Sequence, residues 1–513
     1  MSRAQRLSLI ILTLLLYFQS LSFDFAYDDR LRIVKEPAVT AQGFSCQSFV
    51  SLFVRPTFPG NLYRPITDAT FRLNFLVSGL NPKPFHLTNL LLHLLCVLAV
   101  FELVRLFTAR ALLSWVAAAW FAFHPVQVET VANISGRAEI LAALFGFSAF
   151  FSFLKLSKSK GSSQVFWSGL SALLFLSATL SKESAFSFLF IIPLGSFCLR
   201  GHWEKSQSKG SLCLLLAASI SLTARILVLW PHFFHQNSVP FQAENPLAGP
   251  QITFTERLIF GLQILGRYLG LIVAPLRLSA DYSLGSKDFY ATFYSAWGAF
   301  LIIVFVLWLL ATYVTRKKTY SFFGWWFPLS LILTCNIFFP IGTIMAERLA
   351  YLPSIGAVAF LTCWTEERFL KVKVIKQLSA VIILASSAIL TTERLPVWKN
   401  DLALFIQTAQ DAPRSPKAAE NLAKEFYHRL GDLERAEQYF RQALTLDRFR
   451  LEAMVYLIDL YNRKGDLPRA IYWSKELLAI DPSNSEVQKL LSKLEEFKQR
   501  QGGKSEPQSR SLN

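Results

Sequence analysis

Charged residues are scarce in this chain, and the shortage limits the fold it can adopt. They make up 17% of 513 residues, whereas soluble globular domains average about 25%. The shortage lies in residues 1–395, where apolar runs long enough to cross a bilayer recur. After Trp398 the composition changes to charged, helix-forming residues. We therefore expect an all-α protein: a polytopic helical membrane domain over 1–395, then a soluble helical domain over 396–500.

The six cysteines indicate neither a metal site nor a disulfide framework. Five of the six cysteines lie in or beside apolar runs, where cysteine behaves as a small hydrophobic residue, and only Cys46 lies in a long loop. No Cys-x-x-Cys or mixed Cys/His spacing occurs, so the sequence supports neither a zinc site nor a disulfide framework. The net charge of +17 comes largely from short loops between apolar runs, where basic residues mark the cytoplasmic side. We therefore expect no nucleic-acid partner.

The basic loops set the predicted topology. Arg3 and Arg6 precede the first apolar run, and no small-residue cleavage site follows it, which favours an uncleaved signal anchor. Residues 257–275 are apolar but carry Arg257 and Arg267, so we expect a re-entrant or interfacial helix there. Eleven spans remain, an odd number that places the N-terminus inside and the C-terminal domain outside. They are expected at 7–23, 86–107, 109–123, 138–156, 163–180, 184–199, 211–230, 292–314, 320–340, 351–365 and 375–392.

With this orientation, polar residues that are unusual for a membrane domain gather on the outer face. The first outer loop, 24–85, contains an acidic pair and aromatic, basic segments that suit short interfacial helices. A solvated turn or a structural salt bridge would explain any one charged loop, but four such loops favour a shared polar cavity. The candidate site residues are Asp28, Asp29, Arg64, His86, His124, Arg137, Lys182, Glu347 and Arg348.

Charge pairing within these loops is a second expectation. An ionisable group at membrane depth costs about 2.5–3.5 kcal/mol. The neighbours Lys182 and Glu183, and likewise Glu347 and Arg348, could each offset part of that cost as an ion pair. His124 precedes a proline, and its alternative role is to cap a helix.

These groups predict a chemistry. Arginine offers paired donors that match phosphate oxygens, and a carboxylate at Asp28 or Asp29 can accept a proton from an attacking hydroxyl. Two adjacent acids repel each other, so one can have a raised pKa while the other stays ionised. Glycoside hydrolysis fits less well, because its two carboxylates face each other across the bond. Group transfer from a lipid phosphate to a hydroxyl is the better fit; no metal ligands stand out by spacing, although a divalent metal is not excluded.

The soluble domain contains a repeat of 34 residues. The segment from Tyr427 recurs from Tyr461, and Gly431 and Gly465 hold the same place in the two units. This is the tetratricopeptide (TPR) period, with repeats at about 417–450 and 451–484. Helical flanks are expected to supply the surfaces of a further repeat, since about three are needed for stability. Such arrays present a groove for a protein partner, or act as a spacer. The polar tail, 501–513, is expected to be disordered.

Several segments together resemble the transmembrane and tetratricopeptide repeat-containing (TMTC-like) proteins, and their order covers nearly the whole chain. They are Asp28-Asp29, Tyr63-Arg64-Pro65, Phe71-Arg72-Leu73-Asn74, Phe85–Asn89, Leu92-His93, His124-Pro125-Val126, Gly136–Glu139, Lys182-Glu183 and Glu347–Pro353. That family resembles the GT-C glycosyltransferases, including protein O-mannosyltransferases. The resemblance implies a GT-C-like membrane domain, a polyprenyl-phosphate sugar donor, mannose as the transferred sugar, and a Ser or Thr hydroxyl acceptor on a translocated protein.

The resemblance also implies roles for individual residues. The acidic pair in the first outer loop, Asp28-Asp29, would carry the acid/base role, with Asp28 preferred. Arg64, His86, His124 and Arg137 match motif positions as donor-site candidates. Family members often have many repeats, whereas this chain has few, which suggests a bacterial member with the TPR domain in the periplasm, or in the ER lumen if the chain is eukaryotic. Two other hypotheses stay open: a non-catalytic TPR scaffold and a lipid-linked sugar transporter.

Overall fold

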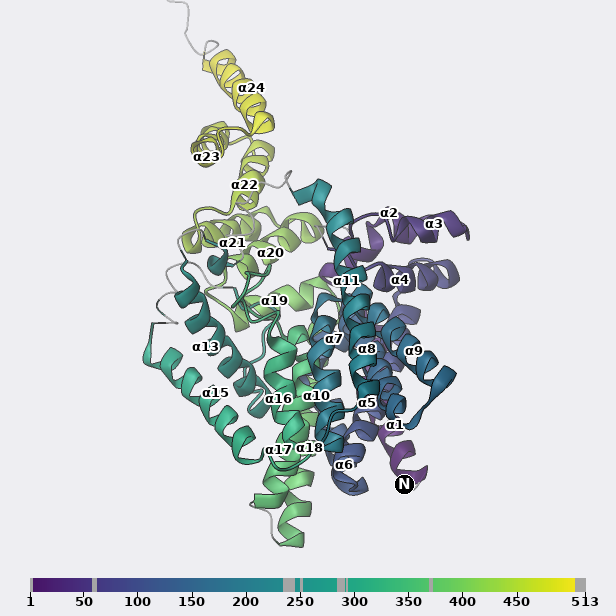
Figure 1. Cartoon of the computed structure of the whole chain (residues 1–513). Helices are drawn as coiled ribbons and strands as arrows, with labels where there is room; N and C mark the ends of the chain where they lie inside the picture. Colours follow the sequence, from purple (N-terminus) through teal and green to yellow (C-terminus); the bar gives the residue numbers. More distant parts are fainter. Residues whose placement is uncertain are drawn as a thin grey trace, which may run out of the picture.

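The computed structural model describes residues 3–57, 62–233, 245–249, 252–283, 291, 294–368 and 372–502. Within those ranges the chain is helical, and the one β-type contact is an isolated bridge between Thr57 and Leu62. A helical bundle forms most of the molecule, and the C-terminal helices rise from one end of it (Figure 1). The predicted disordered tail, 501–513, lies outside the described residues from 503 onward.

Eight helices in the described part of the chain are long and apolar enough to cross a membrane. A ninth span is counted if α6 (Ala111–Phe123) and the following helical residues 125–132, which include α7 (Val128–Ala132), form one span bent by 51°. The architecture is therefore that of an integral membrane protein. The eight are built on α1 (Arg3–Tyr17), α5 (Pro82–Thr108), α8 (Arg137–Lys155), α9 (Gly161–Ser181), α10 (Phe188–Arg200), α11 (Lys205–Phe233), α15 (Ala296–Val314) and α18 (Lys373–Arg394).

These nine positions match nine of the eleven predicted spans, and the other two differ. In place of a span at 320–340, α16 (Ser321–Leu331) has only 11 residues. In place of the span at 351–365, α17 (Tyr351–Arg368) has 18 residues and ends in three consecutive charged ones. The segment predicted to be re-entrant or interfacial forms one helix, α13 (Phe254–Val273), which is not among the eight.

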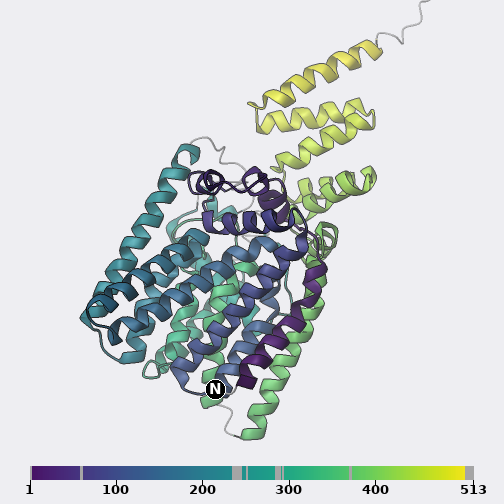
Figure 2. The same cartoon turned by 90° about the vertical axis from the view of Figure 1, so that its right-hand side faces the viewer.

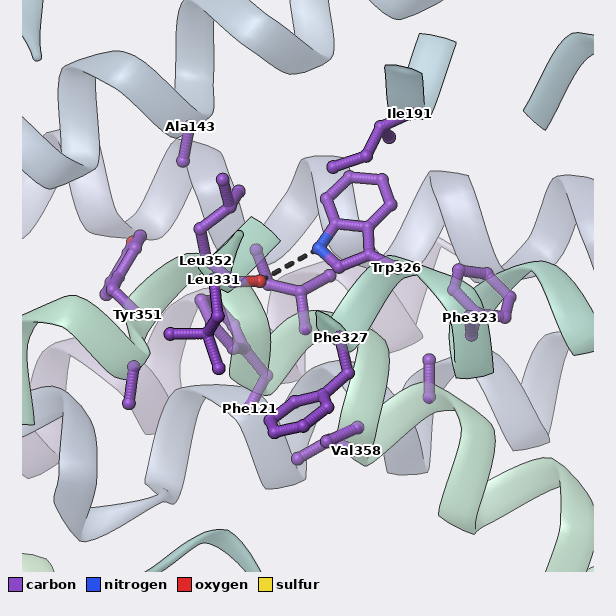
Figure 3. Packing of buried hydrophobic residues seen from close by; sticks show 14 of the residues in the cluster. Phe121, Ala143, Ile191, Phe323, Trp326, Phe327, Leu331, Tyr351, Leu352 and Val358 are labelled. Carbon is purple, nitrogen blue, oxygen red and sulfur yellow. Dashed lines mark hydrogen bonds between the residues drawn. The ribbon is translucent and has the colours of Figure 1, made fainter. Parts of the chain in front are cut away.

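The short helices α16 and α17 lie at the centre of the hydrophobic core. Trp326 is fully buried, and its indole Nε1 donates a hydrogen bond of 2.9 Å to the carbonyl oxygen of Leu352 (Figure 3). A Cβ at Gly356 would come within 2.7 Å of the Phe323 carbonyl oxygen, so glycine is required for this close approach. Replacing a buried tryptophan by alanine typically costs about 3–5 kcal/mol. Helices α16 and α17 therefore pack closely against each other within the core.

The first outer loop forms several short helices across one end of the bundle (Figure 1). They are α2 (Pro37–Thr40), α3 (Cys46–Ser51) and α4 (Pro65–Ser78). Proline at the first position of α4 suits a helix start, because its missing N–H would have no intrahelical partner. Helix α4 ends at Gly79, whose φ of +59° favours glycine.

The C-terminal helices form antiparallel pairs in the TPR manner. They are α19 (Asp401–Asp411), α20 (Pro416–Glu425), α21 (Leu433–Leu446), α22 (Leu451–Arg463), α23 (Leu467–Ile480) and α24 (Ser485–Gly502). The small side chains of Ala436 and Ala470 are fully buried between helices. Gly431 and Gly465, with φ of +65° and +73°, make the turns inside the two repeats. The 34-residue period therefore reappears as two matching helix hairpins.

The first outer loop and the C-terminal helices lie at the same end of the bundle, and the N-terminus lies at the opposite end (Figure 2). The backbone N–H of Asp24 donates to the carbonyl oxygen of Lys399 at 2.9 Å, which joins the two parts directly. The acidic pair follows four residues after Asp24, so it is close to the start of the soluble domain.

Candidate functional site

The acidic pair follows α1 in a turn that the C-terminal domain helps to hold. Tyr27, just before the pair, has a φ of +56°, in the left-handed region that costs a non-glycine residue of order 1–3 kcal/mol. Its backbone N–H donates a hydrogen bond of 2.6 Å to the carboxylate of Asp401, which also pairs with Arg30. A strained backbone persists only where its surroundings hold it, and here a residue of α19 does so.

Asp29 is a fully buried acceptor of four hydrogen bonds. It receives the backbone N–H groups of Ala26 at 3.3 Å, Ile134 at 3.2 Å and Ser135 at 2.6 Å, and the Ser135 hydroxyl at 2.6 Å. Burial raises the pKa of Asp29 to about 7, and these hydrogen bonds limit the rise. Both carboxylate oxygens are committed to protein donors, so Asp29 fastens the first outer loop to residues 124–139, the second of the predicted outer loops.

Asp28 is arranged differently. Its side chain is 37% exposed, and no hydrogen bond holds its carboxylate among the described residues. The nearest cation is Arg348, whose Nη1 lies 3.8 Å from Oδ2 of Asp28. Of the two adjacent acids, Asp28 alone presents a carboxylate to the outside of the fold.

Arg348 links Asp28 to a buried carboxylate. Its backbone N–H and its Nη1 donate to Glu129 at 2.8 Å and 2.7 Å, and the Glu129 side chain is 1% exposed. The guanidinium itself is 25% exposed, and among the described residues Nη2 and Nε make no hydrogen bond. Arg348 is thus fixed by one acid while part of its donor set stays open beside Asp28.

A second ion-pair group is centred on Glu183. Arg64 binds this carboxylate through Nη2 at 2.8 Å and Nε at 3.1 Å, in the paired geometry that arginine favours. Arg225 binds its other oxygen at 2.8 Å and also donates to the carbonyl oxygen of Tyr63 at 2.8 Å. The segment around Arg64, the turn after α9 and the C-terminal part of α11 therefore meet at one acid.

Lys182 lies near both the Arg348–Glu129 pair and the group centred on Glu183. Its ammonium pairs with Glu139, whose other oxygen accepts a hydrogen bond of 2.9 Å from Ser184. Burial lowers the pKa of Lys182 to about 8; Glu139 opposes this, and the nearby charges of Arg64 and Arg348 lower it further. The effect of Arg64 and Arg348 on the pKa of Lys182 indicates that the three cations lie in one polar region.

The predicted pairing of sequence neighbours is wrong. Lys182 pairs with Glu139 rather than Glu183, and Glu347 does not pair with Arg348. Adjacent residues on a helical turn project in different directions, so each finds its partner on another loop. The charge pairs therefore join the outer loops to one another instead of neutralising each loop separately.

Glu347 belongs to a separate buried group. It accepts hydrogen bonds from Arg394 at 3.3 Å and from the Tyr282 hydroxyl at 3.1 Å. Burial raises its pKa to about 8, although Arg394 lowers it. Its side chain is 0% exposed, so it joins the turn that precedes α17 to the end of α18.

Three other candidates, His86, His124 and Arg137, are buried. The guanidinium of Arg137 donates to Asn89 at 2.7 Å and to the Phe85 carbonyl oxygen at 2.9 Å. His124 caps its turn, because Nδ1 accepts the Val126 N–H at 3.2 Å and Nε2 contacts the Ile272 carbonyl oxygen at 2.8 Å. The structure does not place Arg137 or His124 with the exposed carboxylate, and the ring of His86 packs edge-on against Phe23, with ring centroids 6.2 Å apart.

Sequence reasoning omitted the acids that hold the cations in place. Glu129 and Glu139 lie in the second outer loop and the start of α8, and only their contacts across the fold distinguish them from other loop acids. Arg225 could have been identified from the sequence, because an arginine inside an apolar run is costly unless it is paired. In the described part of the chain, no group of three or more His, Cys, Asp or Glu side chains is arranged to hold a metal ion.

The fold and this region define a class: a polytopic helical membrane domain whose charged outer-loop cluster lies beside a TPR domain. Residues 427–494 match the tetratricopeptide repeat family. The membrane domain has relatives among curated proteins. The mouse protein O-mannosyl-transferase TMTC3 is 27% identical over 461 residues, covering 83% of this chain and 49% of that protein.

Two further relatives are also described as protein O-mannosyl-transferases. The human protein O-mannosyl-transferase TMTC1 is 27% identical and covers 84% of this chain and 54% of its own length. A protein O-mannosyl-transferase of Caenorhabditis elegans is 27% identical and covers 86% and 62%. The resemblance to the TMTC-like proteins is thereby confirmed, and the chain spans about half the length of the curated relatives it matches.

Proposed function

We propose that this protein is a membrane glycosyltransferase that moves a sugar, mannose by analogy with its relatives, from a polyprenyl-phosphate donor to a Ser or Thr hydroxyl of a protein. The observation that carries the proposal is the exposed carboxylate of Asp28 beside the partly open guanidinium of Arg348. Similarity to proteins named protein O-mannosyl-transferases supports the reaction class.

In this proposal Asp28 is the general base. The acceptor hydroxyl attacks the anomeric carbon from the face opposite the phosphate and gives its proton to Asp28. The bond between the anomeric carbon and the phosphate oxygen breaks, and the polyprenyl phosphate leaves with that electron pair. The configuration at the anomeric carbon is inverted. Asp29 is unsuited to this role because its oxygens already accept four hydrogen bonds.

Arg348 and Lys182 are the proposed contacts of the donor phosphate. Charge that develops on a leaving phosphate is stabilised by fixed donors, and a guanidinium held by Glu129 is such a donor. Lys182 is held by Glu139 in the same polar region. Arg64 is assigned a structural role and no phosphate contact, since Glu183 binds two of its nitrogens. No metal ion is assigned a role, and none is excluded.

The C-terminal domain is proposed to bring the acceptor to Asp28. Asp401, the first residue of α19, holds the Tyr27 backbone next to the acidic pair. A polypeptide bound along the TPR helices would therefore start close to the base. The proposed reaction takes place on the extracytoplasmic face expected from the basic loops, in the periplasm of a bacterium or the lumen of the ER.

A transfer assay tests the proposed function. Full-length protein in nanodiscs is incubated with polyprenyl-phosphate mannose and a Ser/Thr-containing peptide, and the product is measured by mass spectrometry, with the anomeric configuration from NMR. The proposal expects a mannosylated peptide with inverted configuration. Donor movement across vesicles without a sugar–peptide product would favour a transporter instead. A retained configuration would contradict the direct displacement.

A further inference from the structure

A large cavity lies at the end of the bundle opposite the acidic pair. Its volume is about 960 Å³, within the range of about 300–1,000 Å³ common for ligand pockets. It opens between the C-terminal ends of α5, α8 and α10. Arg6 of α1 contacts Glu102 in its lining, which places the cavity at the end that carries the N-terminus (Figure 2). The cavity takes no part in the proposed sugar transfer.

The polar side of the cavity is strongly basic. Four cations line it, Arg105, Lys155, Lys158 and Arg200, against one carboxylate, Glu102. That acid is already in use, because it pairs with Arg6 at 2.5 Å and with Arg105 at 3.1 Å. Neither lysine has an ion-pair partner among the described residues. Arg105 and Arg200 are paired, with Glu102 and Glu204, so the uncompensated positive charge at the cavity is that of Lys155 and Lys158.

Arg200 adds a donor that the protein leaves unused. Its terminal nitrogens donate to Glu204 at 3.2 Å and to the Leu154 carbonyl oxygen at 3.3 Å. Its Nε is buried and has no hydrogen-bond partner. A buried N–H without a partner costs about 1–3 kcal/mol, and a bound anion or ordered solvent can remove that cost.

The other side of the cavity is apolar. Leu106, Phe151, Leu154 and Leu199 line it next to the basic residues. A preference for basic residues on the cytoplasmic side accounts for the sign of the charge. It does not account for their convergence on one hollow with an apolar wall. A ligand that fits both sides carries a phosphate attached to hydrocarbon.

We propose that this cavity binds one anionic phospholipid, with its phosphate among Lys155, Lys158 and Arg200 and its acyl chains along Phe151 and Leu106. Basic pockets between transmembrane helices on the cytoplasmic side bind such head groups. The site is separate from the donor site around Asp28, and the proposal does not rest on the glycosyltransferase activity.

Native mass spectrometry of the full-length protein tests this site. The protein is extracted from nanodiscs of phosphatidylcholine with or without phosphatidylglycerol, and retained lipids are counted. We expect one phosphatidylglycerol to be retained in preference to phosphatidylcholine. Lys155→Gln with Lys158→Gln should weaken its retention about 30-fold, since each basic residue near a lipid surface contributes about fivefold.

The matched control is Lys317→Gln with Lys373→Gln, which removes two exposed lysines from the same basic face but outside the cavity. This variant should retain the lipid as the unaltered protein does. Equal losses in both double variants would mean a diffuse surface effect and would overturn the site. Displacement of the lipid by inorganic phosphate alone would assign the cavity to a free anion and overturn the lipid assignment.

Discussion

Asp29 accepts the backbone N–H and the hydroxyl of Ser135, each at 2.6 Å, and so binds the first outer loop to the second. The neighbouring Asp28 makes no such bond and faces Arg348. Two consecutive acids therefore have different physical roles, one holding the loop and the other available for chemistry.

At pH 8, where Asp29 is ionised, Asp29→Asn should destabilise the protein by about 1–3 kcal/mol, because its amide group would turn a donor toward the donors of Ile134 and Ser135. Thermal unfolding of the purified protein in detergent measures this. Asp24→Asn is the matched control, since the Asp24 side chain is 52% exposed and its contact with Arg30 is long, at 3.6 Å. Equal unfolding temperatures for the two variants would contradict the fastening role of Asp29.

Stability should fall as the pH rises from about 5 to 8. Asp29 has a pKa of about 7 when folded against an ordinary 3.8, so between these values the folded state keeps a proton that the unfolded state has lost. Glu347 acts in the same direction between 4.5 and about 8. Each group changes the free energy of unfolding by at most about 1.4 kcal/mol per pH unit.

Lys182 has the opposite effect at higher pH. Its pKa is about 8 when folded against 10.5, so stability from this group rises with pH between those values. Unfolding temperatures across the pH range test both statements. Glu347→Gln should flatten the decline below pH 8. A decline unchanged in Glu347→Gln would show that other groups cause it.

Arg348→Lys should slow sugar transfer by about 100-fold, the scale of losing one fixed donor to a developing negative charge. Lysine keeps the charge beside Glu129 but lacks the planar fork that serves Glu129 and a phosphate together. Turnover number and KM for the lipid donor are the measurements. Arg55→Lys, which alters a partly exposed pair with Glu36 in the same loop, should behave as the unaltered protein does. Unchanged turnover in Arg348→Lys would remove Arg348 from the donor site.

Asp401→Asn should slow transfer by about tenfold, because it loses the pairing with Arg30 and weakens the hold on the Tyr27 backbone. The TPR helices should stay folded, as circular dichroism would record. Glu476→Gln, an exposed change on α23, is the control. If Asp401→Asn turns over normally, the soluble domain does not position the acidic pair.

Local sequence patterns predicted much of the fold. The TPR hairpins followed from a 34-residue period because their contacts lie within and between adjacent repeats. Nine predicted spans matched apolar helices for a similar reason. The prediction for 320–340 differed because α16 has only 11 residues, and α17, which covers the whole predicted span 351–365, is not counted because it ends in three charged residues.

The ion pairs of the candidate site could not be predicted in the same way. Arg348 and Glu129 are 219 positions apart, and Arg64 and Glu183 are 119 apart. Which outer loops touch is decided by helix packing, so loop composition indicated a polar cavity but not its pairs. Arg137 and His124 have the residue types of a donor site, yet the protein uses their nitrogens internally.

The most direct test of the account compares the turnover number of Asp28→Asn with that of Asp29→Asn and Asp24→Asn in the transfer assay, with the unfolding temperature of each. Removing a general base typically costs 10²–10⁴-fold. The account predicts that Asp28→Asn loses about that much activity while unfolding at the temperature of the unaltered protein. Turnover by Asp28→Asn equal to that of Asp24→Asn would contradict the assignment of Asp28 as the base.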